Sequence, residues 1–209
     1  MTIRVLGIGN VLWADEGFGV RCLEALLANY QFSPSIELID GGTQGLYLLE
    51  YVQESTHLII LDAIDYGLPA GTLKVVEDAD VPKFLGAKKM SLHQTGFQEV
   101  LQLSLLTGHY PESLVLIGCQ PAQIEDYGGS LTDTVKQAIA PALQLAVERL
   151  QSWGVSVTPR ACTNPMPLDP RVTNISETGI GAELAIELYE QGRPNADIAW
   201  RHGDERFRP

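Results

Sequence analysis

The sequence predicts an α/β fold built around a mostly parallel sheet, and three observations support this prediction. Apolar, β-branched segments typical of buried strands occur at residues 5–8, 36–40, 57–62 and 113–118. Segments with apolar residues at helical spacing alternate with these strands along the chain. The first strand also runs directly into a glycine-rich turn and then a helix, which is the opening half of a βαβ unit.

The turn after the first strand carries two closely spaced glycines, Gly7 and Gly9, and then two acids, Asp15 and Glu16. A G-x-G turn at a helix N-terminus is compatible with a bound dinucleotide. The third glycine of that fingerprint is replaced by Leu12, however, and the loop has no Lys or Arg to compensate its acids. Repulsion between these acids and a phosphate favours a cation here instead.

Two further strands end in an acid. Asp40 ends the second strand and precedes the glycine-rich turn 41–45, and Asp62 ends the third strand. Because the carboxyl ends of parallel strands meet at one edge of a sheet, Glu16, Asp40 and Asp62 are expected to converge there. Ligands of open α/β sheets bind at that edge, so it is the expected place of function.

The remaining elements continue the alternation. Residues 72–77 are typical of a strand at or near a sheet edge. His93 stands just ahead of a helical stretch that runs from residue 97 to 106. The longest helical pattern extends over 131–153, and Ser130 is its expected N-cap.

The chain is predicted to divide into a core domain, residues 1–154, and a C-terminal extension, residues 155–209. Residues 158–173 contain four prolines and no periodicity, which is typical of a linker. One short amphipathic helix is expected at 180–189, before a charged tail. A chain that ends near Trp153 is therefore expected to remain folded.

Composition limits the possible functions. The 209 residues are 45% hydrophobic and 19% charged, which suits one sizeable core. A net charge of -12 and a pI near 4.6 argue against a nucleic-acid partner. No segment has the length of a membrane span and no leader pattern opens the chain, so a cytoplasmic protein without membrane insertion is expected. Cys22, Cys119 and Cys162 are far apart, which predicts neither a disulfide framework nor a thiolate zinc site.

Glu16, Asp62 and His93 form the candidate metal site. Two carboxylates and one imidazole on separate loops suit a divalent transition metal and leave coordination positions for a substrate ligand. Each residue also has a simpler explanation, because a histidine can lie on the surface and an acid can cap a helix or be solvated. The shared position of the three residues at predicted strand ends favours the site.

Five segments together resemble the hydrogenase maturation endopeptidases, the nickel-dependent processing proteases of [NiFe]-hydrogenases. The resemblance runs from the first strand to about Trp153, and its first segment has the long signature G-x-G-N-x-L-x-x-D-E-G-x-G-V. The segments are Gly7–Val20, Asp40–Gly45, Asp62–Ala63, Ser91–His93 and Gly118–Pro121.

The resemblance implies a three-layer α/β/α sandwich around a twisted five-stranded sheet. It also implies a cytosolic endopeptidase that removes the C-terminal extension of a hydrogenase large-subunit precursor after nickel insertion. The metal-contacting positions of the family match Glu16, Asp62 and His93, and Asp40 matches the acid of its D-G-G-T turn. Residues 155–209 lie beyond the shared core, so the resemblance implies nothing about them.

The residues favour hydrolysis without a covalent intermediate. The sequence has no G-x-S-x-G elbow, no H-E-x-x-H helix and no cysteine in a recognisable nucleophile motif. A divalent ion can polarise a peptide carbonyl while a carboxylate takes a proton from water. Either Asp62 or Asp40 could be that base, so the hydrolysis would be aspartic-type or metal-assisted.

Three ligands without a thiolate make an incomplete shell for a resident metal, so nickel is expected to arrive with the substrate. Two alternatives are compatible with the same residues. A non-catalytic nickel chaperone or assembly factor would use the ligands without hydrolysis. A Rossmann-type nucleotide-binding enzyme would place Asp40 on a ribose.

Overall fold

The structure is a computed structural model that describes residues 1–85 and 92–160, without the side chains of 83–85 and 92–95. Its centre is a five-stranded sheet in the order β3-β1-β4-β6-β5. Four strands are parallel, and β5 pairs antiparallel with β6 at one edge. The strands are β1 (Ile3–Ile8), β3 (Glu37–Gly42), β4 (His57–Ala63), β5 (Leu73–Glu77) and β6 (Ser113–Cys119).

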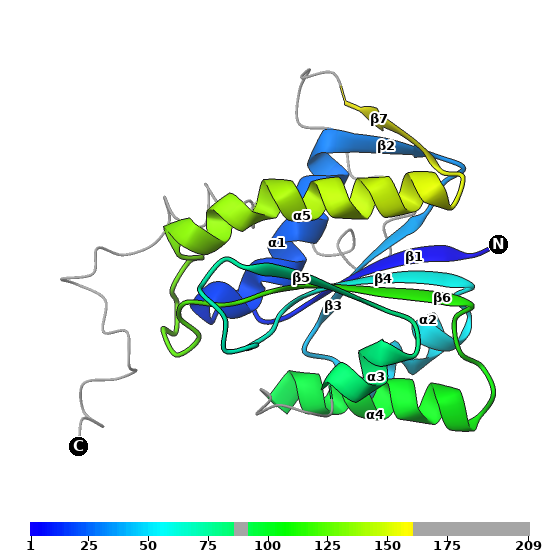
Figure 1. The fold of residues 1–209 in the computed structure, drawn as a ribbon, viewed down its shortest axis with the longest axis horizontal. Coiled ribbons are helices and arrows are strands. Elements are labelled where there is room, and N and C mark those ends of the chain that lie inside the picture. The colour runs from blue at the N-terminus through cyan, green and yellow to red at the C-terminus, as the bar shows by residue number, and fades with distance from the viewer. Residues whose placement is uncertain (86–91, 161–209) are drawn as a thin grey trace.

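Helices cover both faces of this sheet, so the predicted three-layer α/β/α architecture is confirmed (Figure 1). On one face lie α1 (Phe18–Asn29) and α5 (Asp133–Ser152). On the other face lie α2 (Leu49–Gln53), α3 (Asp80–Leu85) and α4 (Leu92–Leu106). Two short 3-10 helices, η1 (Ala14–Gly17) and η2 (Gly45–Leu48), follow β1 and β3.

The central strands are apolar because both of their faces are covered. Every residue of β1 is buried, and so are all but the first residue of β4 and of β6. Alternate side chains of a strand therefore enter different cores. Val5 packs towards α1 and α5, whereas its neighbour Leu6 packs towards α2 and α4. Cys22 lies on α1 with its side chain fully buried.

The described fold continues past residue 154. Val155 is 2% exposed and belongs to the core beneath α5. After it, β7 (Ser156–Pro159) pairs antiparallel with β2 (Tyr30–Ser33), which follows α1. Arg160 then donates backbone and side-chain hydrogen bonds to the carbonyls of Asn29 and Tyr30. Most of the predicted linker and the predicted helix at 180–189 lie outside the described residues.

The long helix α5 begins differently from the prediction. Its N-cap is Thr132, not Ser130, and the Thr132 side chain makes no capping hydrogen bond. The physical reason is a competing partner, because the Thr132 hydroxyl lies 3.1 Å from the Asp15 carboxylate. The start of α5 is therefore set by a contact that is distant in sequence.

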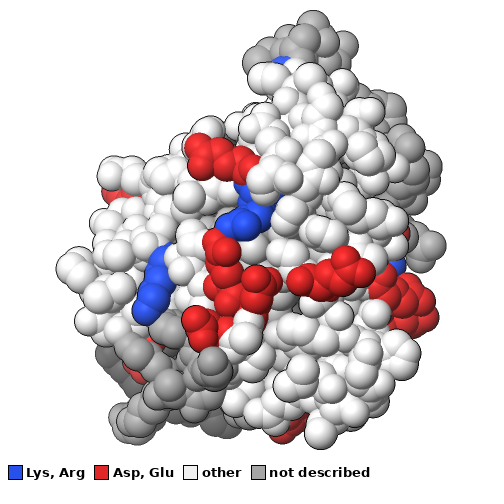
Figure 2. Space-filling view, turned by 45° about the vertical axis from the view of Figure 1, so that its right-hand side comes forward, with Lys and Arg blue, Asp and Glu red and all other residues white. Residues whose placement is uncertain are grey.

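Acidic residues dominate the charged surface. Figure 2 shows acidic side chains gathered across the middle of one face, with few basic side chains beside them. This distribution agrees with the net charge of -12. No helix among the described residues is long and apolar enough to span a membrane. The cytoplasmic location stays a prediction.

The β2–β7 ribbon gives a test of where the folded core ends. Shortening a chain that ends at Arg160 to one that ends at Gly154 removes the buried Val155 and all partners of β2. Burial of a valine stabilises a fold by about 1.5–3 kcal/mol, so the melting temperature should fall by at least about 3 °C. Thermal unfolding followed by circular dichroism measures the difference. Equal melting temperatures would place the end of the core at residue 154.

Candidate functional site

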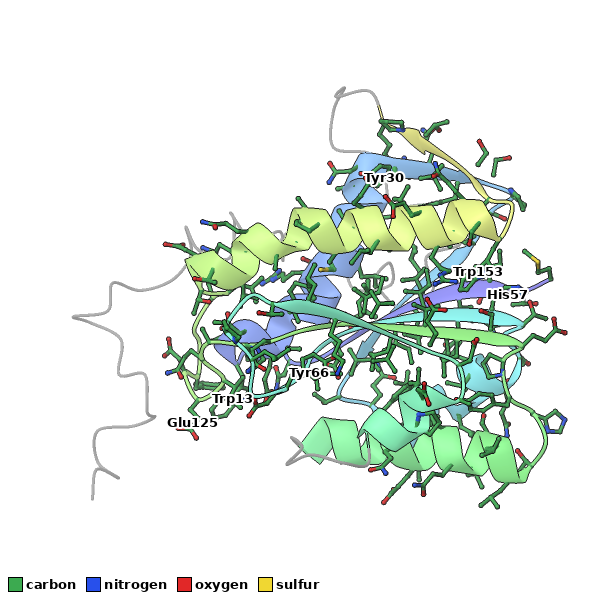
Figure 3. All side chains as sticks on the ribbon, in the orientation of Figure 1. Trp13, Tyr30, His57, Tyr66, Glu125 and Trp153 are labelled. Atoms are coloured by element: carbon green, nitrogen blue, oxygen red, sulfur yellow. The ribbon has the colours of Figure 1, made fainter. Side chains whose placement is uncertain are left out.

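The loops that follow β1, β3, β4 and β6 all leave the sheet at its carboxyl edge. Asp40 pairs in register with Gly7, which pairs on its other side with Leu61, so Asp62 lies one residue beyond the level of Asp40. Figure 3 shows Trp13, Tyr66 and Glu125 towards this end of the molecule, and His57 and Trp153 at the opposite end. The loops that carry the predicted acids therefore leave the same edge of the sheet, and the convergence of their side chains stays a prediction.

The loop after β1 makes a tight turn just before its two acids, Asp15 and Glu16. The Asn10 side chain accepts a hydrogen bond from the backbone N–H of Leu12, and its carbonyl accepts one from Trp13. Ala14 then adopts a left-handed conformation with φ of 41°. Such a φ is uncommon outside glycine and often occurs at functional sites.

The Asp15 side chain points into the protein. It is fully buried, and its carboxylate accepts hydrogen bonds from the backbone N–H groups of Ala122, Gln123 and Thr132 at 2.8, 2.9 and 2.7 Å. The Thr132 hydroxyl donates a fourth bond. The N-terminus of α5, which begins after Thr132, also favours a negative charge at this place. Asp15 therefore fastens the loop after β6 to the loop that carries Glu16.

Close backbone approaches bring the start of α1 to the end of β4. A Cβ atom on Gly19 would collide with the carbonyl oxygens of Leu61 and Ile8. A Cβ atom on Gly9, where φ is 130°, would collide with the carbonyl oxygen of Glu16. The backbone of the G-x-G turn thus packs against the backbone at Glu16, and η1, which contains Glu16, packs beside β4, the strand that contains Asp62.

Asp40 is partly buried, and this environment changes its acidity. Desolvation raises the pKa of its carboxyl group above the ordinary value of 3.8. A hydrogen bond of 2.9 Å from the Gly42 backbone N–H to Asp40 Oδ1 and the positive charge of Arg21 offset part of this rise. The Gly42 carbonyl in turn accepts a bond from Gly9, which joins this loop to the one after β1.

Asp62 is only 3% exposed at the end of β4. The Tyr66 hydroxyl occupies the space where a Cβ atom on Gly118, the register partner of Asp62, would lie. Burial raises the pKa of the Tyr66 hydroxyl, and the negative charge of Asp62 raises it further. Tyr66 is therefore a neutral neighbour of Asp62 at neutral pH.

Gln120 holds the segment that follows Asp62. Its buried amide oxygen accepts hydrogen bonds from the backbone N–H groups of Tyr66 and Leu68 at 2.6 and 3.1 Å. Its amide nitrogen donates to Asp65 Oδ1 at 3.0 Å and to the Pro121 carbonyl at 3.2 Å. The four bonds connect the loops after β4 and β6, so Gln120 positions the chain around Asp62.

His93 is the second residue of α4, and its side chain lies outside the described part of the structure. The backbone of α4 nevertheless shows where residue 93 lies. A Cβ atom on Gly96 would lie 3.3 Å from the Cα of Gly45, and α4 packs against η2, which follows the Asp40 loop. The first turns of α4 therefore lie beside that loop.

The predicted triad of Glu16, Asp62 and His93 stays a prediction as a metal site. Among the side chains that the structure describes, no three His, Cys, Asp or Glu residues form a metal-binding group. Sequence reasoning missed the roles of Asp15 and Gln120, although both lie in segments that carry the family resemblance. Their positions in these segments indicated that the two residues matter, but only the tertiary structure shows which groups they contact.

Acid-bearing loops at the carboxyl edge of a three-layer α/β/α sheet make this edge the candidate functional site of an α/β protein. Comparison with known proteins specifies the family. The sequence model of the hydrogenase maturation protease family matches residues 20–149. The chain belongs to the hydrogenase maturation protease family, and its predicted identification as a maturation endopeptidase is confirmed.

Individual relatives support this assignment. The hydrogenase expression/formation protein HoxM of Cupriavidus necator is 56% identical over 207 residues, which cover 99% of this chain and 98% of HoxM. The hydrogenase 2 maturation protease of Escherichia coli is 42% identical over 161 residues, or 77% of this chain and 97% of that protein. The solved structure of the E. coli hydrogenase maturating endopeptidase HybD has a TM-score of 0.73 and 40% identity, covering 78% of this chain and 100% of HybD.

The Asp15 network predicts a large loss of stability from a small change. Asp15→Asn places an amide N–H₂ among four donors, which leaves at least one buried donor unpaired. The loss should be about 1–3 kcal/mol, or about 3–9 °C in melting temperature. Asp78→Asn is the matched control, because the Asp78 side chain accepts one backbone bond, from Leu114, in an exposed turn. A melting temperature of Asp15→Asn equal to that of the control would contradict the network.

The raised pKa of Asp40 predicts a pH-dependent effect on stability. A carboxyl group with a raised pKa in the folded protein binds its proton more tightly there than in the unfolded chain. Its stabilising contribution is therefore present at low pH and lost as pH rises through the raised pKa. Asp40→Asn should thus become more stable relative to the unmodified protein between about pH 4 and pH 7. Denaturant unfolding across this range measures the change, and the opposite trend would mean a lowered pKa.

Proposed function

We propose that this protein cleaves the C-terminal extension from a [NiFe]-hydrogenase large-subunit precursor after nickel has been inserted. The carrying observation is the meeting of the Asp40, Asp62 and Glu16 loops at one sheet edge within a hydrogenase maturation protease. The E. coli relative is named a hydrogenase 2 maturation protease, and HoxM a hydrogenase expression/formation protein. These names support hydrogenase maturation as the process and proteolysis as the reaction.

In this proposal nickel is part of the substrate. Glu16, Asp62 and His93 contact the nickel ion that the precursor already holds, and the contact brings the adjacent peptide bond to the site. Two carboxylates and one imidazole fit such an ion chemically, and they leave positions for the ligands of the precursor. Cleavage then depends on metal loading, which excludes unloaded precursor.

Asp40 acts as the general base. Its raised pKa and partial burial suit a carboxylate that takes a proton from water, since a base works best when its pKa approaches the working pH. Oδ1 is held by the Gly42 N–H, so the other oxygen is the one that accepts the proton. Water adds to the scissile carbonyl, Asp40 holds its proton, and the proton passes to the leaving amine when the C–N bond breaks. Asp62, nearly fully buried, stays with the ion.

Single substitutions test these roles. Asp62→Ala and His93→Ala should each reduce cleavage of nickel-loaded precursor by about a hundredfold, the scale expected when the scissile bond is misplaced. Mass spectrometry of the large subunit measures the product. Glu112→Ala and His109→Ala are matched controls, because both residues are exposed and lie at the opposite edge of the sheet. Normal cleavage by a site variant would remove that residue from the mechanism.

The source of the metal is tested separately. The same enzyme preparation is incubated with nickel-free and with nickel-loaded precursor, and its metal content is measured by elemental analysis. Cleavage of only the loaded precursor by metal-free enzyme is expected. Equal cleavage of both precursors would contradict the proposal that the substrate supplies the metal. A stoichiometric metal that stays with the enzyme during chelation would show that the metal belongs to the enzyme. Binding of loaded precursor without any change in its mass would favour the chaperone alternative.

A further inference from the structure

The rim of the carboxyl edge carries apolar side chains that the core does not use. Leu12, Ile124 and Tyr127 have 43%, 38% and 49% of their surface exposed. Trp13 lies edge-on against Tyr127, with ring centroids 5.3 Å apart and an interplanar angle of 65°. Exposed aromatic and aliphatic side chains that gather at one place are typical of binding surfaces.

These four residues form one surface, here named the Trp13 rim, although they come from two loops. The backbone N–H of Gly128 donates to the Leu12 carbonyl at 2.7 Å, and Trp13 forms β-bridges with Tyr127 and Gly129. The Asp15 carboxylate holds the backbone just before Ile124. The rim is therefore fixed before any partner arrives, which lowers the entropy lost on binding.

The loops that form the carboxyl edge carry acidic but no basic side chains. The loops 9–17, 40–45, 62–72 and 120–132 contain no Lys or Arg. Glu125 and Asp126 lie between Ile124 and Tyr127 in the sequence, and Figure 3 shows Glu125 at the same end of the molecule as Trp13. A negative rim attracts a positively charged partner and repels an acidic one.

We propose that the Trp13 rim binds the precursor segment next to the scissile bond, and that this segment carries apolar and basic side chains. The inference rests on the proposed function. Two observations favour this occupant. The rim is continuous with the site, because Trp13 lies three residues before Glu16 in the same loop. Its acidic surroundings also complement a basic peptide rather than a second copy of this acidic chain.

Binding at the rim has a distinct kinetic result, because these side chains touch the substrate away from the reacting atoms. Loss of such a contact raises KM and leaves kcat nearly unchanged. Tyr127→Ser should raise the KM for nickel-loaded precursor about tenfold, as expected for an aromatic contact at an interface, with kcat within about twofold. Leu106→Ser is the matched control, because Leu106 is 83% exposed at the far end of α4.

The charge is tested with Glu125→Lys, with Glu112→Lys as its control at the opposite sheet edge. Glu125→Lys should raise KM several-fold at low salt, and the effect should shrink at high salt because ions screen exposed charges. Glu112→Lys should leave KM unchanged. Direct binding of a peptide with the C-terminal sequence of the precursor, measured by calorimetry, should weaken in Tyr127→Ser and Glu125→Lys alike.

The outcomes separate this inference from the proposed function. If the unmodified protein does not cleave precursor, the proposed function fails. The peptide-binding measurement still tests whether the Trp13 rim binds the precursor segment. If it cleaves precursor and Tyr127→Ser keeps both KM and peptide affinity, the rim is not the docking surface. Dissociation of a dimer by Tyr127→Ser, or a loss of thermal stability with unchanged KM, would assign the rim to a second copy or to this chain itself.

Discussion

The arrangement of the candidate site depends on one buried carboxylate. Asp15 has no exposed surface and accepts four hydrogen bonds from the loop between β6 and α5. These bonds replace the water that the charge loses on burial, and removal of any donor would leave a buried charge less well compensated. The interaction joins the Glu16 loop, the start of α5 and the Trp13 rim into one unit.

Close backbone contacts form the second constraint. The start of α1 lies so near β1 and β4 that only glycine fits at Gly19, and the Glu16 carbonyl similarly requires Gly9. A Cβ atom on Gly7 would likewise collide with the Gly19 carbonyl oxygen, so backbone packing explains both glycines of the turn that resembles a nucleotide-binding motif, Gly7 and Gly9. This packing brings η1 beside Asp62, while the Gln120 side chain holds the chain that follows Asp62.

Chemistry and recognition are divided among neighbouring loops. Asp40 has a raised pKa because it is partly desolvated, which suits proton transfer, whereas Asp62 is almost fully buried at the strand end. The apolar side chains of Leu12, Ile124 and Tyr127 remain exposed nearby. If the site recognises a loaded metal as proposed, an acidic rim beside it would let one protease select both the peptide and the metal-loaded state of its substrate.

The sequence by itself predicted the α/β class and the mostly parallel sheet, because strands buried on both faces are apolar throughout and their alternation with helices favours parallel crossovers. Its motifs also identified the family. The tertiary structure alone decided the N-cap of α5 and the pairing of β7 with β2. It likewise decided that the Asp15 side chain is fully buried and joins two loops, whereas the side chain of its neighbour Glu16 is only partly buried. The reason is physical: these features depend on contacts between residues more than a hundred positions apart, such as Asp15 with Thr132, and no local pattern encodes such a partner.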